Sequence, residues 1–264
     1  MIENTSIVTA IFDIGRDKWD NYSLSYNTYS HWMRNLLMFD TNMVIYTEEK
    51  FVDFIKSQRK IVDPNLKKTI IIIKELKSLE TYKLYYEKVK TLMESEKFKS
   101  KIFFQVPEMT KPLYNIIIFN KLYFIKRSIE EKHFGSDFFI WCDAGVLRND
   151  EPQVKKGFPS LKKINNGYQD KITFFSHHLD FKTDDKNFHL LSQFRYIHGG
   201  CFFVPNNDTI DDLINDFENE IEISLKNEFV GSEEKYFDFC YLNNKNNFNL
   251  VKSDWRQYFD IFGS

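Results

Sequence analysis

The fold of this chain can be worked out from residues 138–148, which read FFIWCDAGVLR. The apolar run Phe138–Cys142 is typical of a strand buried on both faces, and it ends at an acid, Asp143. Gly145 follows shortly after. In open α/β sheets, ligands bind outside the carboxyl ends of the strands, so Asp143 is in position to meet one. The same residues also fit an ordinary Asp-Ala-Gly turn at the end of a strand.

The residues before this stretch alternate between strand and helix patterns. Runs rich in β-branched and apolar residues predict strands at Ser6–Phe12, Asn42–Tyr46 and Thr69–Ile73. Apolar residues spaced by three and four predict the helices: Tyr22–Leu37 capped by Asn21 or Ser23, one around Phe51–Ile55, Leu79–Ser95, and Asn115–Lys132 with Pro112 near its start. Each crossover is long enough to connect parallel strands, so we expect an α/β fold with a mostly parallel sheet flanked by helices.

The sequence after position 148 alternates less regularly between strand and helix patterns. Glu151–Asp170 is rich in proline, glycine and asparagine, which predicts a loop region that could lie over a site. Further elements are expected as strands at Ile172–Phe175 and Cys201–Val204, and as helices at Ile210–Ile221 and after Ser232, whose hydroxyl can cap the helix. Neither an internal repeat nor a low-complexity linker divides the sequence, so we expect a single domain over residues 1–264.

The composition limits the partners and the compartment. Hydrophobic residues make up 42% of the chain, as in a folded domain, and 36 basic residues against 38 acidic ones give a net charge of −2. Such a chain has no overall basic field, so nucleic acid is not an expected partner. The three cysteines fit no zinc-ribbon spacing and indicate free thiols. We find neither a signal peptide nor a transmembrane segment, and we expect a cytoplasmic protein.

The candidate chemistry centres on Asp143, because the common signatures of P-loop proteins, dehydrogenases, α/β-hydrolases and zincins are missing. A carboxylate at this position suits Mg²⁺ or Mn²⁺, which bind one or two carboxylates together with substrate phosphates. Such a metal neutralises the charge on a departing diphosphate. A single acid is a weak basis for a divalent ion, so a second ligand is expected from Asp150, His177, His178 or the diphosphate itself.

Other candidate residues come from distant parts of the chain. Glu233 and Glu234 follow a Gly-Ser pair; one of them can act as a general base on an acceptor hydroxyl, or both can simply complement the dipole of a helix. The segment His198-Gly199-Gly200 permits close approach of a ligand, or forms a tight turn before a strand. Three basic residues can contact phosphate or remain solvated charges: Arg16, Lys121 and Arg148.

In their order and spacing, these residues resemble the HtrL/YibB family, also called WlaTC/HtrL, which is treated as glycosyltransferase-like. The resemblance runs through nearly the whole chain. It rests on SIVTAIFDIGR at residues 6–16, PLYN at 112–115 with Lys121, FGSDFFIWCDAG at 134–145 with Arg148, IHGGCFF at 197–203 and VGSEE at 230–234.

The resemblance implies a GT-A-like fold and transfer of a sugar from a nucleotide-sugar donor, expected to be a UDP-sugar, to a glycan or another hydroxylated acceptor. Residues 1–148 are then the nucleotide-sugar-binding portion, with a Rossmann-like sheet, and residues 149–264 the acceptor-binding portion. In GT-A enzymes an Asp-x-Asp motif at the end of a central strand binds the donor ribose and the metal. Asp143 matches the first acid and Gly145 replaces the second, which leaves open whether Mn²⁺ or Mg²⁺ is required.

The implied roles fall on two sets of residues. Contacts to the donor or cofactor are expected from Asp13, Arg16, Lys121, Asp143, Ala144, Gly145, Arg148, Gly199 and Gly200, with Asp143 also the expected metal ligand. Catalytic contacts are expected from Glu233, Glu234 and His198. Two other functions fit the same residues: a catalytically silent module that binds a nucleotide or a glycan, and a nucleotidyltransferase.

Overall fold

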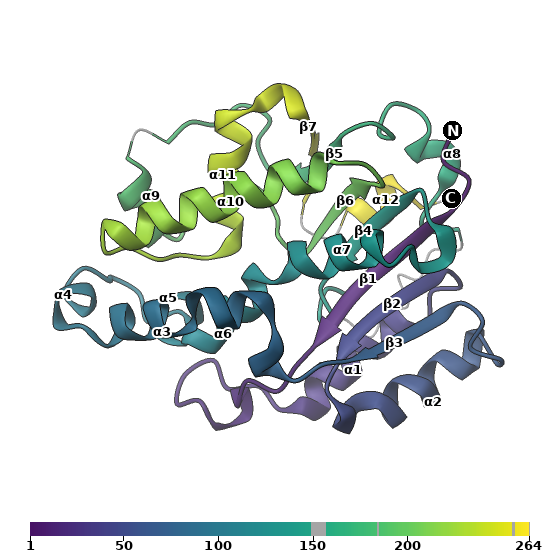
Figure 1. Ribbon diagram of the computed structural model, residues 1–264, viewed down its shortest axis with the longest axis horizontal. Helices are drawn as coiled ribbons and strands as arrows, with labels where there is room; N and C mark the ends of the chain where they lie inside the picture. Colours follow the sequence, from purple (N-terminus) through teal and green to yellow (C-terminus); the bar gives the residue numbers. More distant parts are fainter. Residues whose placement is uncertain (149–156, 184, 255–256, 264) are drawn as a thin grey trace.

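A seven-stranded sheet forms the centre of the protein (Figure 1). The computed structural model describes residues 1–148, 157–183, 185–254 and 257–263. Within them the strands are β1 (Thr5–Ile11), β2 (Asn42–Thr47), β3 (Thr69–Ile73), β4 (Phe138–Cys142), β5 (Ile172–Ser176), β6 (Cys201–Pro205) and β7 (Phe248–Lys252), in the order β3-β2-β1-β4-β6-β5-β7. Strand β6 runs antiparallel to β4 and β5, and the other neighbours are parallel. The predicted α/β fold with a mostly parallel sheet flanked by helices is confirmed.

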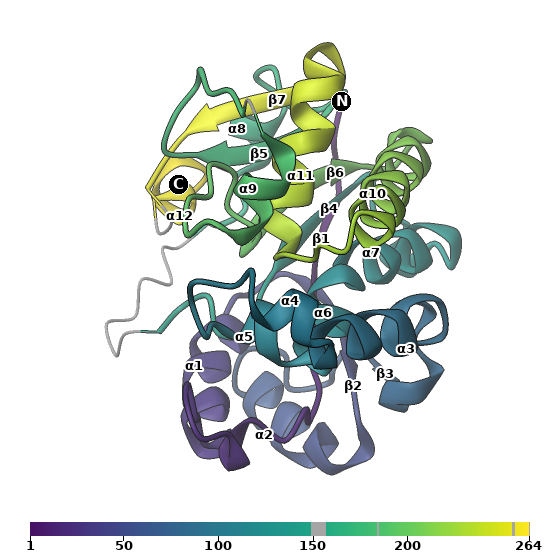
Figure 2. The same cartoon turned by 90° about the vertical axis from the view of Figure 1, so that its left-hand side faces the viewer.

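Helices cover both faces of this sheet (Figures 1 and 2). One face carries α3 (Glu80–Glu94), α5 (Pro107–Thr110), α6 (Pro112–Phe119), α7 (Lys121–Glu130), α10 (Thr209–Lys226) and α11 (Glu233–Asn243). The other carries α1 (Tyr26–Leu37), α2 (Val52–Val62) and α12 (Tyr258–Ile261). Three short helices complete the set: α4 (Glu96–Lys99), α8 (Leu161–Ile164) and α9 (Lys186–Leu191). An apolar core therefore lies on each side of the sheet.

Strand β4 divides these two cores and positions the candidate site. Phe139 and Trp141 pack into the core on the α7 side, and the even-numbered residues of β4 pack into the core on the α1 side. Because side chains alternate along a strand, the next odd-numbered residue, Asp143, continues on the α7 side. The indole N–H of Trp141 donates to the Asp143 carboxylate at 2.7 Å. The period of the strand thus directs the acid at its end toward α7.

The single helix expected over Asn115–Lys132 is wrong, because the chain breaks at Asn120 into α6 and α7. The side-chain oxygen of Asn120 accepts hydrogen bonds from the backbone N–H and the hydroxyl of Thr81, at 3.2 and 3.0 Å. This buried contact with the start of α3 fixes the break. As a result Lys121 is the first residue of α7.

Two further expectations differ from the structure. Helix α1 is capped by Ser25, whose hydroxyl accepts from the N–H of Thr28 at 3.2 Å, and not by Asn21 or Ser23. The loop expected over Glu151–Asp170 falls partly outside the described residues, at 151–156. Its described part packs away from the candidate site, with the Phe158 ring against Phe39 and Phe259.

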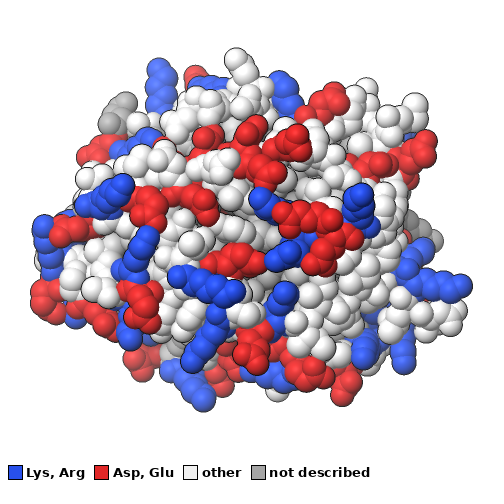
Figure 3. Space-filling model, viewed as in Figure 1, with Lys and Arg blue, Asp and Glu red and all other residues white. Residues whose placement is uncertain are grey.

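The surface carries mixed charge. Figure 3 shows acidic and basic side chains interspersed over the face that α7, α10 and α11 occupy. Ion pairs connect the helices there, as between Lys88 and Glu222 and between Lys126 and Asp211, each at 2.5 Å. Within the described ranges, no helix combines the length and the apolar character that a membrane crossing requires. The three cysteines are buried and carry free thiols.

Candidate active site

A cleft of about 400 Å³ opens where the carboxyl ends of β1 and β4 meet the start of β6. Arg16 lines it after β1, Asp143 and Gly145 line it after β4, and Gly200 lines it before β6. Lys121 and Glu233, the first residues of α7 and α11, lie in the same wall. Ligand sites in open α/β sheets occupy this edge, and a cleft of this size is sufficient for a small organic ligand. Residues from five parts of the sequence thus converge on one cleft.

Asp143 presents its carboxylate to this cleft with an exposed fraction of 39%. One carboxylate oxygen lies 2.9 Å from the ammonium nitrogen of Lys121 and also accepts from the Trp141 indole. The backbone N–H of Asp143 donates to the carbonyl of Gly200 at 2.9 Å, which continues the β4–β6 pairing. The acid is therefore held on two sides while part of it faces solvent.

Lys121 is the charge at the centre of the site and is only 3% exposed. Its ammonium group donates to the carboxylates of Asp143 and Glu233, and to the carbonyl oxygen of Gly199 at 3.0 Å. Burial alone would lower the pKa of Lys121, but the two carboxylates outweigh burial and raise that pKa above its ordinary value. Lys121 therefore carries its positive charge throughout the physiological range.

Glu233 is buried at the start of α11, with an exposed fraction of 5%. Its burial raises the pKa of the carboxyl above 4.5, Lys121 partly opposes that rise, and the nearby acids Glu234 and Asp143 add to it. Ser232 occupies the N-cap position, yet its hydroxyl makes no capping hydrogen bond. The predicted capping role of Ser232 is therefore wrong, and its side chain instead lines the cleft.

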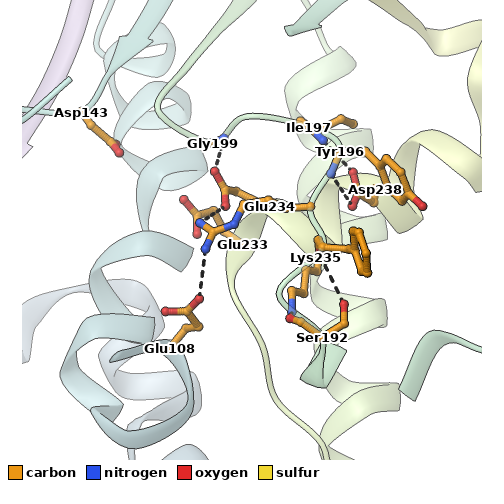
Figure 4. A network of polar contacts seen from close by, with 12 residues as sticks. Glu108, Asp143, Ser192, Tyr196, Ile197, Gly199, Glu233, Glu234, Lys235 and Asp238 are labelled. Carbon is orange, nitrogen blue, oxygen red and sulfur yellow. Dashed lines mark hydrogen bonds and ion pairs between the residues drawn. The ribbon is translucent and has the colours of Figure 1, made fainter. Parts of the chain in front are cut away.

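Glu234 connects α11 to the loop before β6. One of its carboxylate oxygens accepts from the backbone N–H of Gly199 at 3.0 Å, and the other pairs with Arg195 at 2.7 Å. Arg195 also lies 3.6 Å from the carboxylate of Glu108 in α5. Figure 4 shows this chain of contacts, with Asp143 pointing from the end of β4 toward Glu233 and Glu234. Arg195 escaped the sequence analysis, although its position three residues before His198 is a signal that could have found it.

The same helix fixes the rest of that loop. The carboxylate of Asp238, one helical turn further along α11, accepts from the backbone N–H groups of Ile197 and Tyr196, at 2.9 and 3.3 Å. It also bonds the His189 ring at 2.8 Å (Figure 4 shows Asp238 beside Tyr196 and Ile197). A buried carboxylate with three partners is a rigid anchor. The loop and the acids at the start of α11 therefore form one unit.

Gly199 and Gly200 have different surroundings. A Cβ atom at Gly199 would overlap the Glu233 carboxylate and lie 2.9 Å from Cγ of Glu234. A Cβ atom at Gly200 would meet its nearest neighbour at 3.7 Å, an ordinary contact. The sequence led us to expect a ligand close to this glycine pair. At Gly199 it is instead the side chains of Glu233 and Glu234 that lie close to the backbone.

Arg16 and Arg148 also line the cleft. The guanidinium of Arg16 donates to the backbone carbonyl of Tyr22 at 3.2 Å and to the hydroxyl of Tyr29, so both of these partners are neutral. Arg148 donates to the carbonyl of Gly145 at 3.3 Å, and its guanidinium lies 5.3 Å from the centre of the Trp32 ring. Guanidinium groups held in this way suit a planar or anionic ligand.

Two predicted donor contacts lie outside the lining of the cleft. Asp13 accepts from the N–H of Gly15 at 2.8 Å and from the hydroxyl of Tyr26, and it pairs with Lys50. Its carboxylate therefore shapes the turn after β1. Gly199 takes part through its backbone, whose carbonyl accepts from Lys121 and whose N–H donates to Glu234. The predicted residue Ala144 does line the cleft.

His198 also lines the cleft and is only 5% exposed. Among the described residues, neither of its ring nitrogens has a hydrogen-bond partner. Burial, together with the neighbouring His177, whose ring centre lies 4.3 Å away, lowers its pKa to about 4. A buried imidazole without a protein partner is costly.

Replacing His198 by asparagine should flatten the acid side of the stability curve. The pKa of His198 in the folded protein, about 4, lies below the ordinary 6.5, so the unfolded chain binds the proton more tightly. The stability that depends on neutral His198 is therefore fully present above about pH 6.5 and is lost as the pH falls toward 4. Between these pH values, the free energy of unfolding should change more steeply with pH in the wild type than in His198→Asn. We expect the two slopes to differ by up to about 1.4 kcal/mol per pH unit, measured by urea unfolding. The exposed neighbour His178, changed to asparagine, serves as the control; equal slopes in wild type and His198→Asn would contradict the assignment.

The donor atoms in the cleft do not fit a divalent metal. No group of three His, Cys, Asp or Glu side chains among the described residues could hold one. Asp150, a candidate second ligand, lies outside the described residues. His177 lines the cleft, whereas His178 lies against the Tyr196 ring. The carboxylate of Asp143 already pairs with the Lys121 ammonium.

Comparison with known proteins gives a family and distant likenesses of fold. Two solved structures resemble the chain, each at 10% identity. The first is the galactosyltransferase LgtC in complex with donor and acceptor sugar analogues, with a TM-score of 0.43 over 93% of this chain and 73% of that one. The second is the 4-diphosphocytidyl-2C-methyl-D-erythritol synthase of Anaerococcus prevotii, with a TM-score of 0.40 over 96% of this chain and 88% of that one. Protein HtrL of Escherichia coli K12 is 23% identical over 283 residues, which cover 99% of this chain and 92% of that protein. The model of the HtrL_YibB family matches residues 3–264. The chain therefore belongs to the HtrL_YibB family, described as bacterial proteins of unknown function.

Proposed function

We propose that this protein is a glycosyltransferase that moves a sugar from a nucleoside diphosphate sugar, a UDP-sugar in the first instance, to a hydroxyl group of a glycan or another acceptor. One observation carries the proposal. The cleft at the carboxyl ends of β1 and β4 is lined by Arg16 and Arg148 and by the carboxylates of Asp143, Glu233 and Glu234. A diphosphate is bound by arginine guanidinium groups, and a hydroxyl nucleophile needs a carboxylate as its general base.

The donor side of the proposal rests on Arg16, Arg148 and Asp143. The two guanidinium groups are expected to contact the diphosphate, because arginine matches phosphate oxygens with paired N–H groups. The part-exposed carboxylate of Asp143 is expected to accept a hydrogen bond from a hydroxyl of the ribose or the sugar. These residues belong to the portion 1–148, which we propose binds the nucleotide-sugar.

The acceptor side rests on the start of α11, in the portion 149–264. The acceptor hydroxyl oxygen forms the new bond to the anomeric carbon, and the bond from that carbon to the diphosphate oxygen breaks. The hydroxyl proton passes to Glu233, and the bonding electron pair leaves with the nucleoside diphosphate. Glu234 holds the loop that carries His198, which lines the cleft.

The test is to measure binding and turnover together, by calorimetry with UDP, UDP-glucose and UDP-GlcNAc and by an assay for released UDP. Replacing Arg16 by alanine should weaken UDP binding by about 10- to 100-fold, because a charge-assisted contact to phosphate contributes about 1.5–3 kcal/mol. The control is Arg34→Ala, an exposed arginine of α1 that does not line the cleft.

The same measurements distinguish the other functions. Binding without UDP release across a broad panel of acceptors would favour a silent nucleotide- or glycan-binding module. Pyrophosphate release from a nucleoside triphosphate and a sugar phosphate would favour a nucleotidyltransferase. Unchanged UDP affinity in Arg16→Ala would show that the diphosphate does not lie at this edge of the cleft.

A further inference from the structure

We propose that the ammonium group of Lys121 takes the place of a divalent cation beside Asp143, so that sugar transfer proceeds without a bound metal. This inference rests on the proposed function. It concerns how the site obtains its central positive charge, which Mg²⁺ or Mn²⁺ would otherwise supply.

The contacts of Lys121 are those of a small cation. Its nitrogen lies among three oxygen donors: the carboxylate of Asp143 at 2.9 Å, the carboxylate of Glu233, and the carbonyl of Gly199 at 3.0 Å. Carboxylate and carbonyl oxygens are also the groups that bind hard divalent ions. Since an ammonium group has three N–H donors, this oxygen set satisfies it. A metal ion at the same point would have to displace a buried lysine.

The position of the missing second acid is also crowded. A Cβ atom at Gly145 would lie 3.2 Å from the Trp32 ring and 3.4 Å from the Tyr29 ring. A side chain at this position therefore requires the Trp32 ring to shift by a few tenths of an ångström. The glycine thus packs closely against the aromatic wall of the cleft, which disfavours a second acid at this strand end.

The fold holds Lys121 in place before any ligand arrives. The break at Asn120, bonded to Thr81, makes Lys121 the first residue of α7 and directs it toward the end of β4. Its nitrogen also lies 5.9 Å from the centre of the Trp141 ring. A group fixed by packing and by hydrogen bonds needs little reorganisation during the reaction, which is what electrostatic stabilisation requires. Because the protein uses all three N–H donors of Lys121, this residue acts on the diphosphate through its charge, and the direct contacts to the diphosphate come from Arg16 and Arg148.

The experiment compares the whole wild-type protein and Lys121→Ala, after treatment with EDTA and after adding back Mn²⁺ or Mg²⁺. We expect UDP affinity and UDP release in the wild type to agree within about twofold with and without metal, whereas a metal-dependent site should respond by tenfold or more. Mn²⁺ alone, titrated by calorimetry, should not bind the wild type at this site. Lys121→Ala frees the oxygen set, so it should gain Mn²⁺ binding, and Lys121→Ala with Asp143→Asn should lose it again.

The outcomes separate the inference from the proposed function. Stimulation of the wild type by metal of about tenfold or more, or Mn²⁺ binding that Asp143→Asn abolishes, would overturn the inference. If the wild type neither binds nor turns over a UDP-sugar under any condition, the proposed function fails, and the Mn²⁺ titration of the wild type still decides whether Lys121 excludes a metal. That titration does not use Lys121→Ala, so it stands even if Lys121→Ala does not fold. A folded Lys121→Ala protein that binds Mn²⁺ no better than wild type counts against the inference.

Discussion

Replacing Glu233 by glutamine is expected to lower the rate of sugar transfer by about 10²- to 10⁴-fold while UDP affinity changes little, because a general base contributes that much to a proton transfer. Glutamine keeps an oxygen that can accept from Lys121, so the contact with the ammonium survives. What is lost is the group that takes the proton of the acceptor hydroxyl. Comparing wild type with Glu233→Gln therefore separates the loss of the base from changes in packing. The measurements are the rate of sugar transfer at saturating donor and the UDP affinity by calorimetry.

The pH dependence supplies a second readout of the same change. The pKa of Glu233 is raised above the ordinary 4.5 by burial, and only the ionised carboxylate can act as the base. The wild-type rate should therefore increase with pH as this group loses its proton, and Glu233→Gln should lack that increase. Glu222→Gln, a change at a more exposed glutamate of α10 paired with Lys88, is the control and should match wild type. An active Glu233→Gln enzyme with the wild-type pH profile would show that another group is the base.

Replacing Gly199 by alanine is the second change with a large expected effect, a loss of activity of about 100-fold. The added Cβ would overlap the Glu233 carboxylate and press on Cγ of Glu234, so both acids must move. A displacement of about 1 Å at reacting groups is enough for a loss of this size. Overpacking of a buried site should also lower the free energy of unfolding by about 1–3 kcal/mol.

The neighbouring glycine gives a matched control. Gly200→Ala adds the same methyl group at ordinary contact distance, 3.7 Å from its nearest neighbour, so its free energy of unfolding should stay within about 0.5 kcal/mol of wild type. Urea unfolding and UDP release would be measured for both variants. Equal effects at the two positions would mean that Glu233 and Glu234 can move aside without consequence.

The sequence predicted the central strand and its terminal acid because that signal is local. An unbroken apolar run that stops at Asp143 needs no knowledge of distant residues. Strand β7 was missed because Phe248–Lys252 is short, lies at the edge of the sheet and is mostly part-exposed, so the sequence shows neither a clear alternation nor an unbroken apolar run there. The break at Asn120 was missed because its cause, Thr81, lies 39 residues earlier.

By itself the sequence determined the α/β class, the mostly parallel sheet and the presence of an acid at the end of β4, since these follow from periodicity and crossover length. Only the tertiary structure decided what that acid meets. Lys121 is 22 residues from Asp143 and 112 from Glu233, and no local pattern encodes which side chains come together over such separations. The pairing of a buried ammonium with these two carboxylates, and the crowding of Gly145 by Tyr29 and Trp32, arise from packing of helices that are far apart in the chain.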